Sequence, residues 1–421
     1  MGIEAGSSKL LLRAALLDAP GKWAGVEEKL TFWEATISLS VSMLGTGIVV
    51  FPYSFALCGY VVGPIALIAL GVLAYLSFLS LIRCTAKMHV TSYAGLLQAL
   101  PSAWGHYTNA SLWLLLVLTS AAYVLVTSDI IRSFALRDDA EVPVVLQSPI
   151  LFAVVLAVSF PFCLCKSLHG LSATSAYCSF AIVAAVALIL NDLCEIARGD
   201  PLPPSLAVTG SAQPRSVVIA LPILGCGMFG HMNTSQMYAE LQSDVKPKAH
   251  RIALLCCMIA VAMYMLVGAA GYAAFGRGTQ PDILAQIAAR RGESLSVVLI
   301  QGLLASYVML KTPLLILPLR SLTLMLFHPT SAAGPPDLSG RSHVALTFAL
   351  LACVYAAAIA MPDLGQLLQL LGAVCVIPIC FVVPARLAWT IEVPRPTPRC
   401  LVMASVGILA SALSLLQSIV A

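Results

Sequence analysis

The sequence predicts an all-α polytopic membrane protein with about eleven transmembrane helices, and three observations support this prediction. The chain of 421 residues is 60% apolar and 10% charged, with a mean hydropathy of +0.94. Soluble domains carry about 45–50% apolar and about 25% charged residues. Apolar runs recur along the whole chain, and its basic residues are distributed unequally between the two predicted sides of a membrane.

Eleven apolar runs follow a more polar N-terminal segment. A transmembrane helix needs about 20 mostly apolar residues, so each run predicts one span. Little of the chain remains for a separate soluble domain, which usually takes about 100–150 residues. The runs cover residues 32–58, 60–83, 110–134, 149–165, 171–190, 215–240, 252–276, 294–327, 343–361, 364–388 and 400–420.

The charges assign a side to each loop. With the N-terminus inside, fifteen of the 23 Lys and Arg residues fall on the inner side and seven on the outer side, while Lys311 lies within the eighth run. This bias predicts a cytoplasmic N-terminus and an outer C-terminus. The lipid bilayer is thus the expected partner. Because 19 acidic residues nearly balance the basic ones, no dense basic face for nucleic acid is expected.

Glycine pairs interrupt two of the runs in matching positions. Gly45-Thr46-Gly47 interrupts the first run and Gly225-Cys226-Gly227 the sixth. A single pair is explained by close helix packing, but two matched breaks are typical of inverted-repeat transporters. We therefore predict a 5+5 inverted repeat with broken helices 1 and 6 and an extra C-terminal helix. The predicted parts are a tail (1–31), a first repeat (32–190), an outer loop (191–214), a second repeat (215–388), and an inner loop with helix 11 (389–421).

Unwinding a helix in mid-membrane gives its backbone a chemical role. Glycine permits the unwinding, and the freed N–H and C=O groups face a cavity rather than lipid. The positive end of a half-helix attracts an anionic group such as a carboxylate. The two breaks therefore predict a secondary transporter for a substrate with such a group.

Three stretches carry a resemblance to the amino acid/auxin permease family. The first run reads GTGIVVFPYSFA from Gly45, and with Gly59 it resembles the family's G-S/T-G-I-L-x-L-P-Y-A-x-x-x-x-G signature. The sixth run and the seventh are similar to its H-x6-Y-x-E-L and G-Y-x-x-F-G stretches, through His231, Tyr238-Ala239-Glu240-Leu241 and the GYAAFG at 271–276. Residues 313–320 resemble its P-x4-P-x-R.

The resemblance implies a LeuT-like fold, amino acid substrates, and alternating access around a site between helices 1, 3, 6 and 8. The backbone of the first break would bind the substrate carboxylate, and free carbonyls of the second would bind the ammonium. Tyr123 resembles a residue of helix 3 that lines the site in relatives, although an aromatic that only packs between helices is the alternative. The predicted substrate-binding residues are Gly45, Thr46, Gly47, Ile48, Tyr123, Gly225, Cys226, Gly227, Met228 and Phe229.

Lys311 and His231 are the predicted coupling residues. A charged amine deep in a membrane helix is costly unless it is paired, hydrated or neutral, so Lys311 is suited to proton exchange. The resemblance places it at a sodium-binding Thr of helix 8, and places Val41 at the partner Asn of helix 1. We therefore expect sodium independence, with proton coupling or facilitated exchange. The alternatives are a lysine that snorkels or pairs statically, and for His231, which can titrate near neutral pH, a structural hydrogen bond.

Glu34, Glu240 and Arg320 are predicted gate residues. Glu34 and Glu240 lie at the inner ends of helices 1 and 6, where they would pair with Arg320 or Lys29 and separate on opening. Ordinary interfacial charges are the alternative.

No enzyme signature accompanies these features: the sequence lacks a Ser-His pair at nucleophile spacing, an H-E-x-x-H motif and an intramembrane Asp pair. We expect no metal and no cofactor, with a proton as the coupling ion. The alternatives are a sodium-coupled amino acid transporter and an amino acid sensor with little flux. The sequence leaves open which amino acid is moved, in which direction, and across which membrane (plasma membrane or vacuolar/lysosomal). It also leaves the oligomeric state open, although a monomer is sufficient for transport.

Overall fold

The fold is a bundle of long helices, and their bounds follow the apolar runs closely. The computed structural model describes residues 30–97, 99–135, 148–164, 172–199, 213–292, 294–327, 340–391 and 398–420. The helical elements are α2 (Phe32–Met43), η1 (Thr46–Val50), α3 (Phe51–Met88), α4 (Tyr93–Leu97), α5 (Ser102–Ala135), α6 (Ser148–Cys163), α7 (Ser172–Gly199), α8 (Pro214–Cys226), α9 (His231–Glu240), η4 (Lys246–Lys248), α10 (Ala249–Phe275), η5 (Gly276–Gly278), α11 (Ile283–Arg291), α12 (Leu295–Phe327), α13 (Gly340–Ala360), α14 (Leu364–Leu371), η6 (Gly372–Val376), η7 (Pro378–Val382), α15 (Val383–Ile391) and α16 (Pro398–Val420).

The prediction of an all-α polytopic membrane protein is confirmed. Within the described residues, nine helices are long and apolar enough to cross a membrane, and α6 is a shorter apolar helix. The first of the nine, Gly47–Met88, combines two predicted spans. They join at Gly59, whose φ of 77° and ψ of 174° are not helical and suit glycine alone. These helices account for the predicted set of about eleven spans.

Two helices extend beyond the runs that predicted them. α5 begins at Ser102 rather than 110, because polar residues such as Thr108, whose hydroxyl donates to Trp104 O at 2.8 Å, continue the helix. α7 continues to Gly199, so the first part of the predicted outer loop at 191–214 is helical. Residues 1–29 of the predicted tail and residues 200–212 lie outside the described residues.

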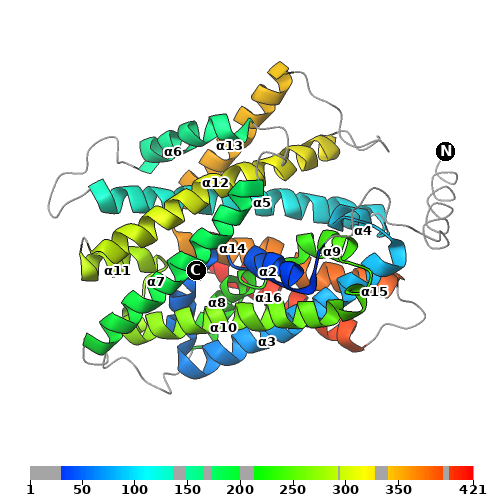
Figure 1. Ribbon diagram of the computed structural model, residues 1–421, viewed down its shortest axis with the longest axis horizontal. Helices are drawn as coiled ribbons and strands as arrows, with labels where there is room; N and C mark the ends of the chain where they lie inside the picture. The colour runs from blue at the N-terminus through cyan, green and yellow to red at the C-terminus, as the bar shows by residue number, and fades with distance from the viewer. Residues whose placement is uncertain are drawn as a thin grey trace.

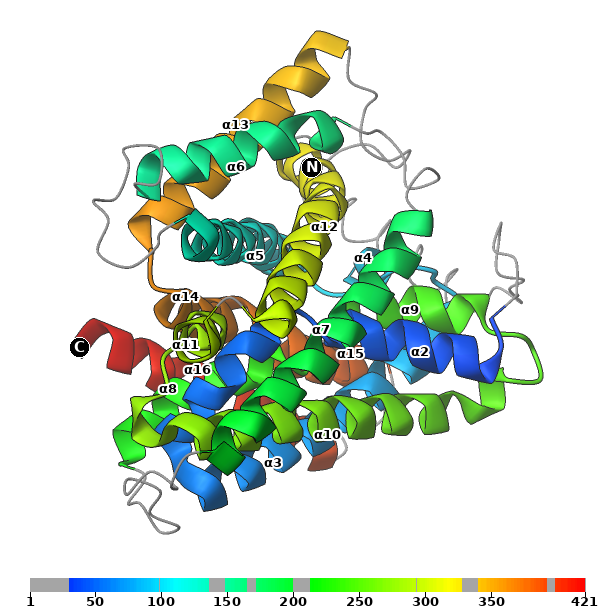
Figure 2. The same ribbon diagram turned by 60° about the vertical axis from the view of Figure 1, so that its left-hand side comes forward.

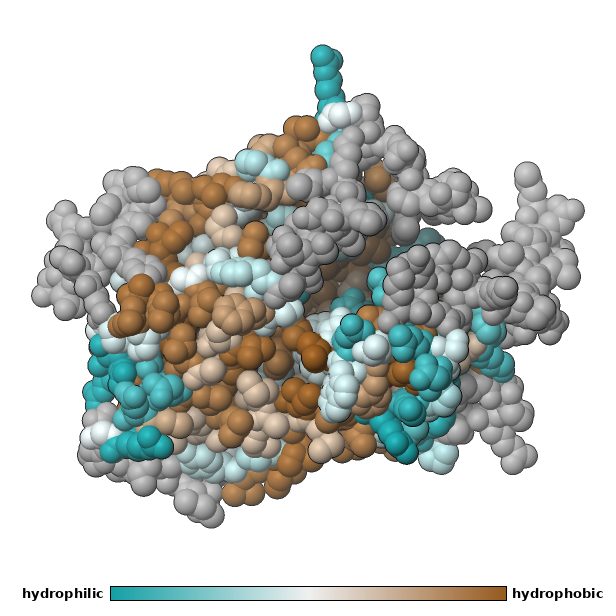
Figure 3. Space-filling view, in the orientation of Figure 1, coloured by the Kyte–Doolittle hydropathy of each residue, from teal (hydrophilic) through white to brown (hydrophobic). Residues whose placement is uncertain are grey.

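The surface is that expected of a protein in a bilayer. Figure 3 shows a broad hydrophobic band across the middle of the molecule, with hydrophilic side chains gathered toward its two ends. Large apolar side chains are exposed on several helices, including Phe180 of α7 and Phe348 of α13, each 67% exposed. An apolar surface of this extent marks contact with lipid.

Small residues bring α3 and α10 into close contact, and the two helices run side by side in Figures 1 and 2. A Cβ on Gly271 of α10 would lie 2.4 Å from Pro52 Cβ, and one on Gly268 would lie 2.7 Å from Phe55 Cδ2. Close approach through small residues is a common way of packing membrane helices. The GYAAFG stretch thus positions the beginning of α3 directly after the first break.

The tenth span is π-helical over two stretches, η6 and η7. Gly372 begins η6, where a Cβ would lie 2.3 Å from the carbonyl oxygen of Pro222 in α8. π-Helical turns are frequent at functional sites. Here η6 lies against α8, the helix that leads into the second break.

Candidate functional site

Both predicted breaks are present. The first lies between α2 and η1, where Leu44 (φ −77°, ψ 108°) and Gly45 (φ −128°, ψ −176°) are extended. The second lies between α8 and α9, over residues 227–230. The four half-helices meet at these points, and α2 and α9 lie beside each other in both ribbon views (Figures 1 and 2).

The first break presents a free amide group beside open space. Ile48 N donates to Gly45 O at 3.1 Å, whereas the amide of Gly47 has no backbone acceptor among the described residues. A Cβ on Gly45 or Gly47 would find no atom within 4 Å. Free amides at the start of a helical segment suit an anionic group, which is the role predicted for these residues. Ile48 is fully buried behind them.

The second break leaves only part of the predicted range of carbonyls free. A tight turn extends α8, since Met228 N donates to Gly225 O at 3.0 Å and Phe229 N donates to Cys226 O at 3.3 Å. The carbonyls of Gly225 and Cys226 are therefore already occupied. Those of Gly227 and Met228 have no backbone donor within the described part of the chain, so the carbonyls left free for an ammonium lie in the second half of the predicted range 225–228, and their binding role stays a prediction.

The two breaks touch through close packing at glycine. A Cβ on Gly227 would lie 2.5 Å from Phe51 Cζ and 2.7 Å from Tyr264 Cε2. The rings of Phe51 and Tyr264 are stacked with centroids 3.9 Å apart. On the other side, a Cβ on Gly230 would lie 2.8 Å from Met43 Cγ. The half-helices can approach this closely only because both positions are glycine.

His231 begins α9 and is fully buried among aromatic rings. Its ring stacks on Phe78 with centroids 4.3 Å apart, and Phe229 and Phe381 lie at 6.5 Å. Neither ring nitrogen has a hydrogen-bond partner among the described residues. The structural hydrogen bond considered from sequence is therefore not formed there, and the coupling role of His231 stays a prediction.

Lys311 lies at the middle of α12, where it is half-buried. Its Nζ is 5.9 Å from the centroid of the Tyr307 ring, and Tyr307 in turn lies edge-on to Tyr123 of α5 at 6.5 Å. The structure thus brings Tyr123 and Lys311 together through a tyrosine that sequence reasoning missed. The coupling role of Lys311 stays a prediction.

The predicted gate residues do not come together. Arg320 is buried, and its Nη1 donates to Cys163 O at 2.8 Å and Thr347 Oγ1 at 3.0 Å, and contacts His343 Nε2 at 3.0 Å. It therefore ties α12 to α6 and α13 and does not pair with Glu34 or Glu240.

Glu34 and Glu240 have local partners instead. Glu34 accepts from Thr31 N at 2.9 Å in a capping box at the start of α2, and Glu240 accepts from Gln236 Nε2 at 2.8 Å. The backbone joins these two inner ends: Leu30 N donates to Glu240 O at 2.9 Å and Gln242 N to Leu30 O at 3.1 Å. This isolated parallel bridge pairs Leu30 with Leu241. Lys29 lies outside the described residues.

Comparison with known proteins decides the family. The family model for transmembrane amino acid transporter proteins matches residues 28–416, which is nearly the whole chain. The protein belongs to this family. It is a multi-pass membrane transporter and not an enzyme.

Named relatives of this amino acid transporter agree with the match. The amino acid transporter AVT6C of Arabidopsis thaliana is 26% identical over 83% of this chain and 83% of its own. Vacuolar amino acid transporter 2 of Saccharomyces cerevisiae is 22% identical over 85% of this chain and 76% of its own. The sodium-coupled neutral amino acid symporter 2 of Danio rerio is 22% identical over 55% of this chain and 49% of its own.

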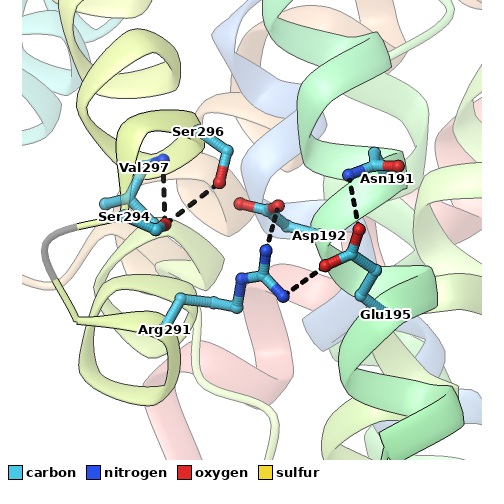
Figure 4. A network of polar contacts seen from close by, with 7 residues as sticks. All are labelled: Asn191, Asp192, Glu195, Arg291, Ser294, Ser296 and Val297. Atoms are coloured by element: carbon cyan, nitrogen blue, oxygen red, sulfur yellow. Dashed lines mark hydrogen bonds and ion pairs between the residues drawn. The ribbon is translucent and has the colours of Figure 1, made fainter.

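An ion-pair network fastens α11 of the transporter to α7. Figure 4 shows the guanidinium of Arg291, at the end of α11, between two carboxylates of α7. Arg291 Nη2 lies 3.3 Å from Asp192 Oδ1, and Nη1 contacts Glu195 Oε2 at 2.5 Å. Asp192 is 0% exposed whereas Glu195 is 45% exposed. α11 also contacts η1 and α5, so this network holds it over the first break on the predicted outer side.

We expect Arg291→Ala to lower the stability of the transporter. The substitution leaves the buried Asp192 carboxylate without its cation, and an unpaired buried polar group costs about 1–3 kcal/mol. The measurement is the thermal unfolding midpoint of the purified protein in detergent. Arg251→Ala removes a charge of the same kind from an exposed position of α10 and serves as the control. Equal midpoints for the two variants would contradict a special role for Arg291. So would a double variant, Arg291→Ala with Asp192→Asn, whose midpoint is no higher than that of Arg291→Ala alone.

Sequence reasoning missed three groups of residues: Tyr264, Tyr307, and the Arg291 network. A signal for Tyr264 was present, because Tyr264, Gly268 and Gly271 recur at spacings of four and three and so share one face of the seventh span. For Arg291, the acidic residues after the fifth apolar run indicated charges on the outer side, but not their partner.

Proposed function

We propose that the protein moves amino acids across its membrane by alternating access, without sodium and coupled to protons. Two features support the alternating-access part. The breaks offer a free amide on one side and free carbonyls on the other, which suit the carboxylate and the ammonium shared by all amino acids. α11 is fastened over the first break by Arg291, as expected of a closed outer side.

The position of Lys311 is the observation that carries the proton-coupling part. Its amine lies halfway along a membrane-spanning helix, and no carboxylate among the described residues forms an ion pair with it. A charged amine in such a place is costly, so loss of its proton to one side of the membrane is readily linked to conformation. Val41, an apolar residue of α2, offers no side-chain oxygen to sodium.

The test is uptake of labelled amino acids into proteoliposomes under an inward proton gradient or an inward sodium gradient. We expect the proton gradient to stimulate uptake and the sodium gradient to have no effect. Stimulation by sodium would overturn the coupling proposal in favour of a sodium-coupled transporter, the activity named for the Danio rerio relative. Binding without uptake under either gradient would favour an amino acid sensor.

We expect Lys311→Ala to abolish the response to the proton gradient. Uptake driven by the amino acid gradient alone should persist, because the backbone site does not depend on this side chain. Lys311→Arg is the matched variant: it keeps the positive charge but does not release a proton, so it should also lose the response. Proton-driven uptake retained in Lys311→Arg would show that Lys311 acts only as a fixed charge.

The proposed location is the membrane of an acidic, vacuole-like compartment. Relatives from two yeasts are named vacuolar amino acid transporters, and a proton gradient is available across such a membrane. A fluorescent fusion of the full chain tests this, and fluorescence confined to the plasma membrane would contradict it. A monomer is sufficient for the proposed mechanism.

A further inference from the structure

Tyr264 of α10 contacts both breaks although it belongs to neither. It is 1% exposed, and its hydroxyl donates to Met43 O at 2.8 Å. Its ring stacks on Phe51, the first residue of α3, at an interplanar angle of 17°. The same ring faces Gly227 in the second break. One side chain thus touches the end of α2, the beginning of α3 and the end of α8.

The hydrogen bond satisfies a carbonyl that the break leaves without a helical donor. Met43 is the last residue of α2, and the extended backbone of Leu44 and Gly45 carries the following amides away from it. A carbonyl without a donor in the middle of a membrane costs several kcal/mol. The Tyr264 hydroxyl supplies that donor from a neighbouring helix, which fixes the direction in which α2 ends.

We infer that Tyr264 is a positioning residue for substrate binding. The Tyr264–Met43 hydrogen bond holds the peptide groups at 44–47 so that the amide of Gly47 stays free for the substrate carboxylate. The ring, packed between Phe51 and Gly227, holds the second break at a fixed distance from the first. This inference rests on the proposed function, since it assumes that the substrate binds at the breaks.

The test is Tyr264→Phe, which removes the hydroxyl and keeps the ring. Loss of one hydrogen bond to the backbone predicts about a three- to tenfold rise in KM for uptake and in Kd for binding. The rise should be the same for small and large amino acids, because all of them share the carboxylate. The maximal uptake rate per transporter should change less than the KM does.

Tyr272→Phe is the matched control. Tyr272 lies about two turns further along the same helix, is also 1% exposed, and packs against Tyr60 instead of Phe51. The Tyr272→Phe variant should leave the KM unchanged. Its thermal stability should differ from that of Tyr264→Phe by no more than the effect of one hydrogen bond.

Each outcome decides the inference. An unchanged KM in Tyr264→Phe would overturn it while leaving the proposed function intact, and so would a KM that rises for one amino acid only, since that would place Tyr264 in the side-chain pocket. If the wild-type protein neither takes up nor binds any amino acid in the mixture, the proposed function fails and the inference fails with it.

Discussion

Replacing Gly227 with alanine is expected to reduce amino acid uptake by about tenfold or more. The added methyl group would lie 2.5 Å from Phe51 Cζ and 2.7 Å from Tyr264 Cε2. Both rings are held, Phe51 by its stack on Tyr264 and Tyr264 by its bond to Met43 O, so the two breaks must move apart. Overpacking of this kind costs about 1–3 kcal/mol, and here it would distort the proposed binding site. Uptake into proteoliposomes, normalised to folded transporter, is the measurement.

Gly302→Ala is the control for the Gly227 variant. Gly302 lies inside α12, and a Cβ there would find no atom within 4 Å. Alanine is also favoured over glycine in a helix by about 1 kcal/mol, so this variant should be as active as the wild type and at least as stable. Normal uptake by Gly227→Ala would show that the breaks tolerate separation and that the substrate does not bind between them.

Replacing Gly372 with alanine is expected to have the largest effect on folding. The Cβ would lie 2.3 Å from the carbonyl oxygen of Pro222 and 2.6 Å from its carbonyl carbon. These are backbone atoms, so relief requires α8 to shift away from η6. We expect the free energy of unfolding to fall by about 3 kcal/mol or more, which is at or beyond the upper end of the cost for overpacked cores. The unfolding midpoint and the yield of monodisperse protein are the measurements.

Gly225→Ala is the control for the Gly372 variant. That Cβ would lie 3.2 Å from Cγ1 of Ile377, which is a side-chain atom. A side chain can move aside at small cost, so Gly225→Ala should fold nearly as well as the wild type. A Gly372 variant that is as stable as the Gly225 variant would show that α8 and η6 are not tightly packed.

The spans were predictable from sequence because lipid imposes a simple rule on composition. A helix in a bilayer must be apolar over its whole length, so the eleven apolar runs directly marked the positions of the spans. The ends were less certain, since the first turns of α5 and the last turns of α7 leave the apolar region and carry polar residues such as Thr108 and Glu195. Gly45 and Gly227 were found because backbone unwinding needs a particular residue type.

The partners within the site were not predictable because they depend on packing between distant segments. Arg320 was expected at the inner gate, yet a carbonyl of α6 and two side chains of α13 surround it. Tyr264 was missed because a tyrosine in an apolar run looks like any other packing residue. Which carbonyls are free in the second break depends on a single turn of backbone, and residue types do not encode that turn.

The bridge between Leu30 and Leu241 links the movements of α2 and α9. The two half-helices are joined at their inner ends by two backbone hydrogen bonds and meet again where Gly230 packs on Met43. At about 0.5–1.5 kcal/mol for each hydrogen bond, pulling the inner ends apart costs about 1–3 kcal/mol more than moving them together. In the proposed alternating-access cycle, α2 and α9 would therefore move together about the breaks, so that both parts of the proposed binding site would release the substrate in the same movement.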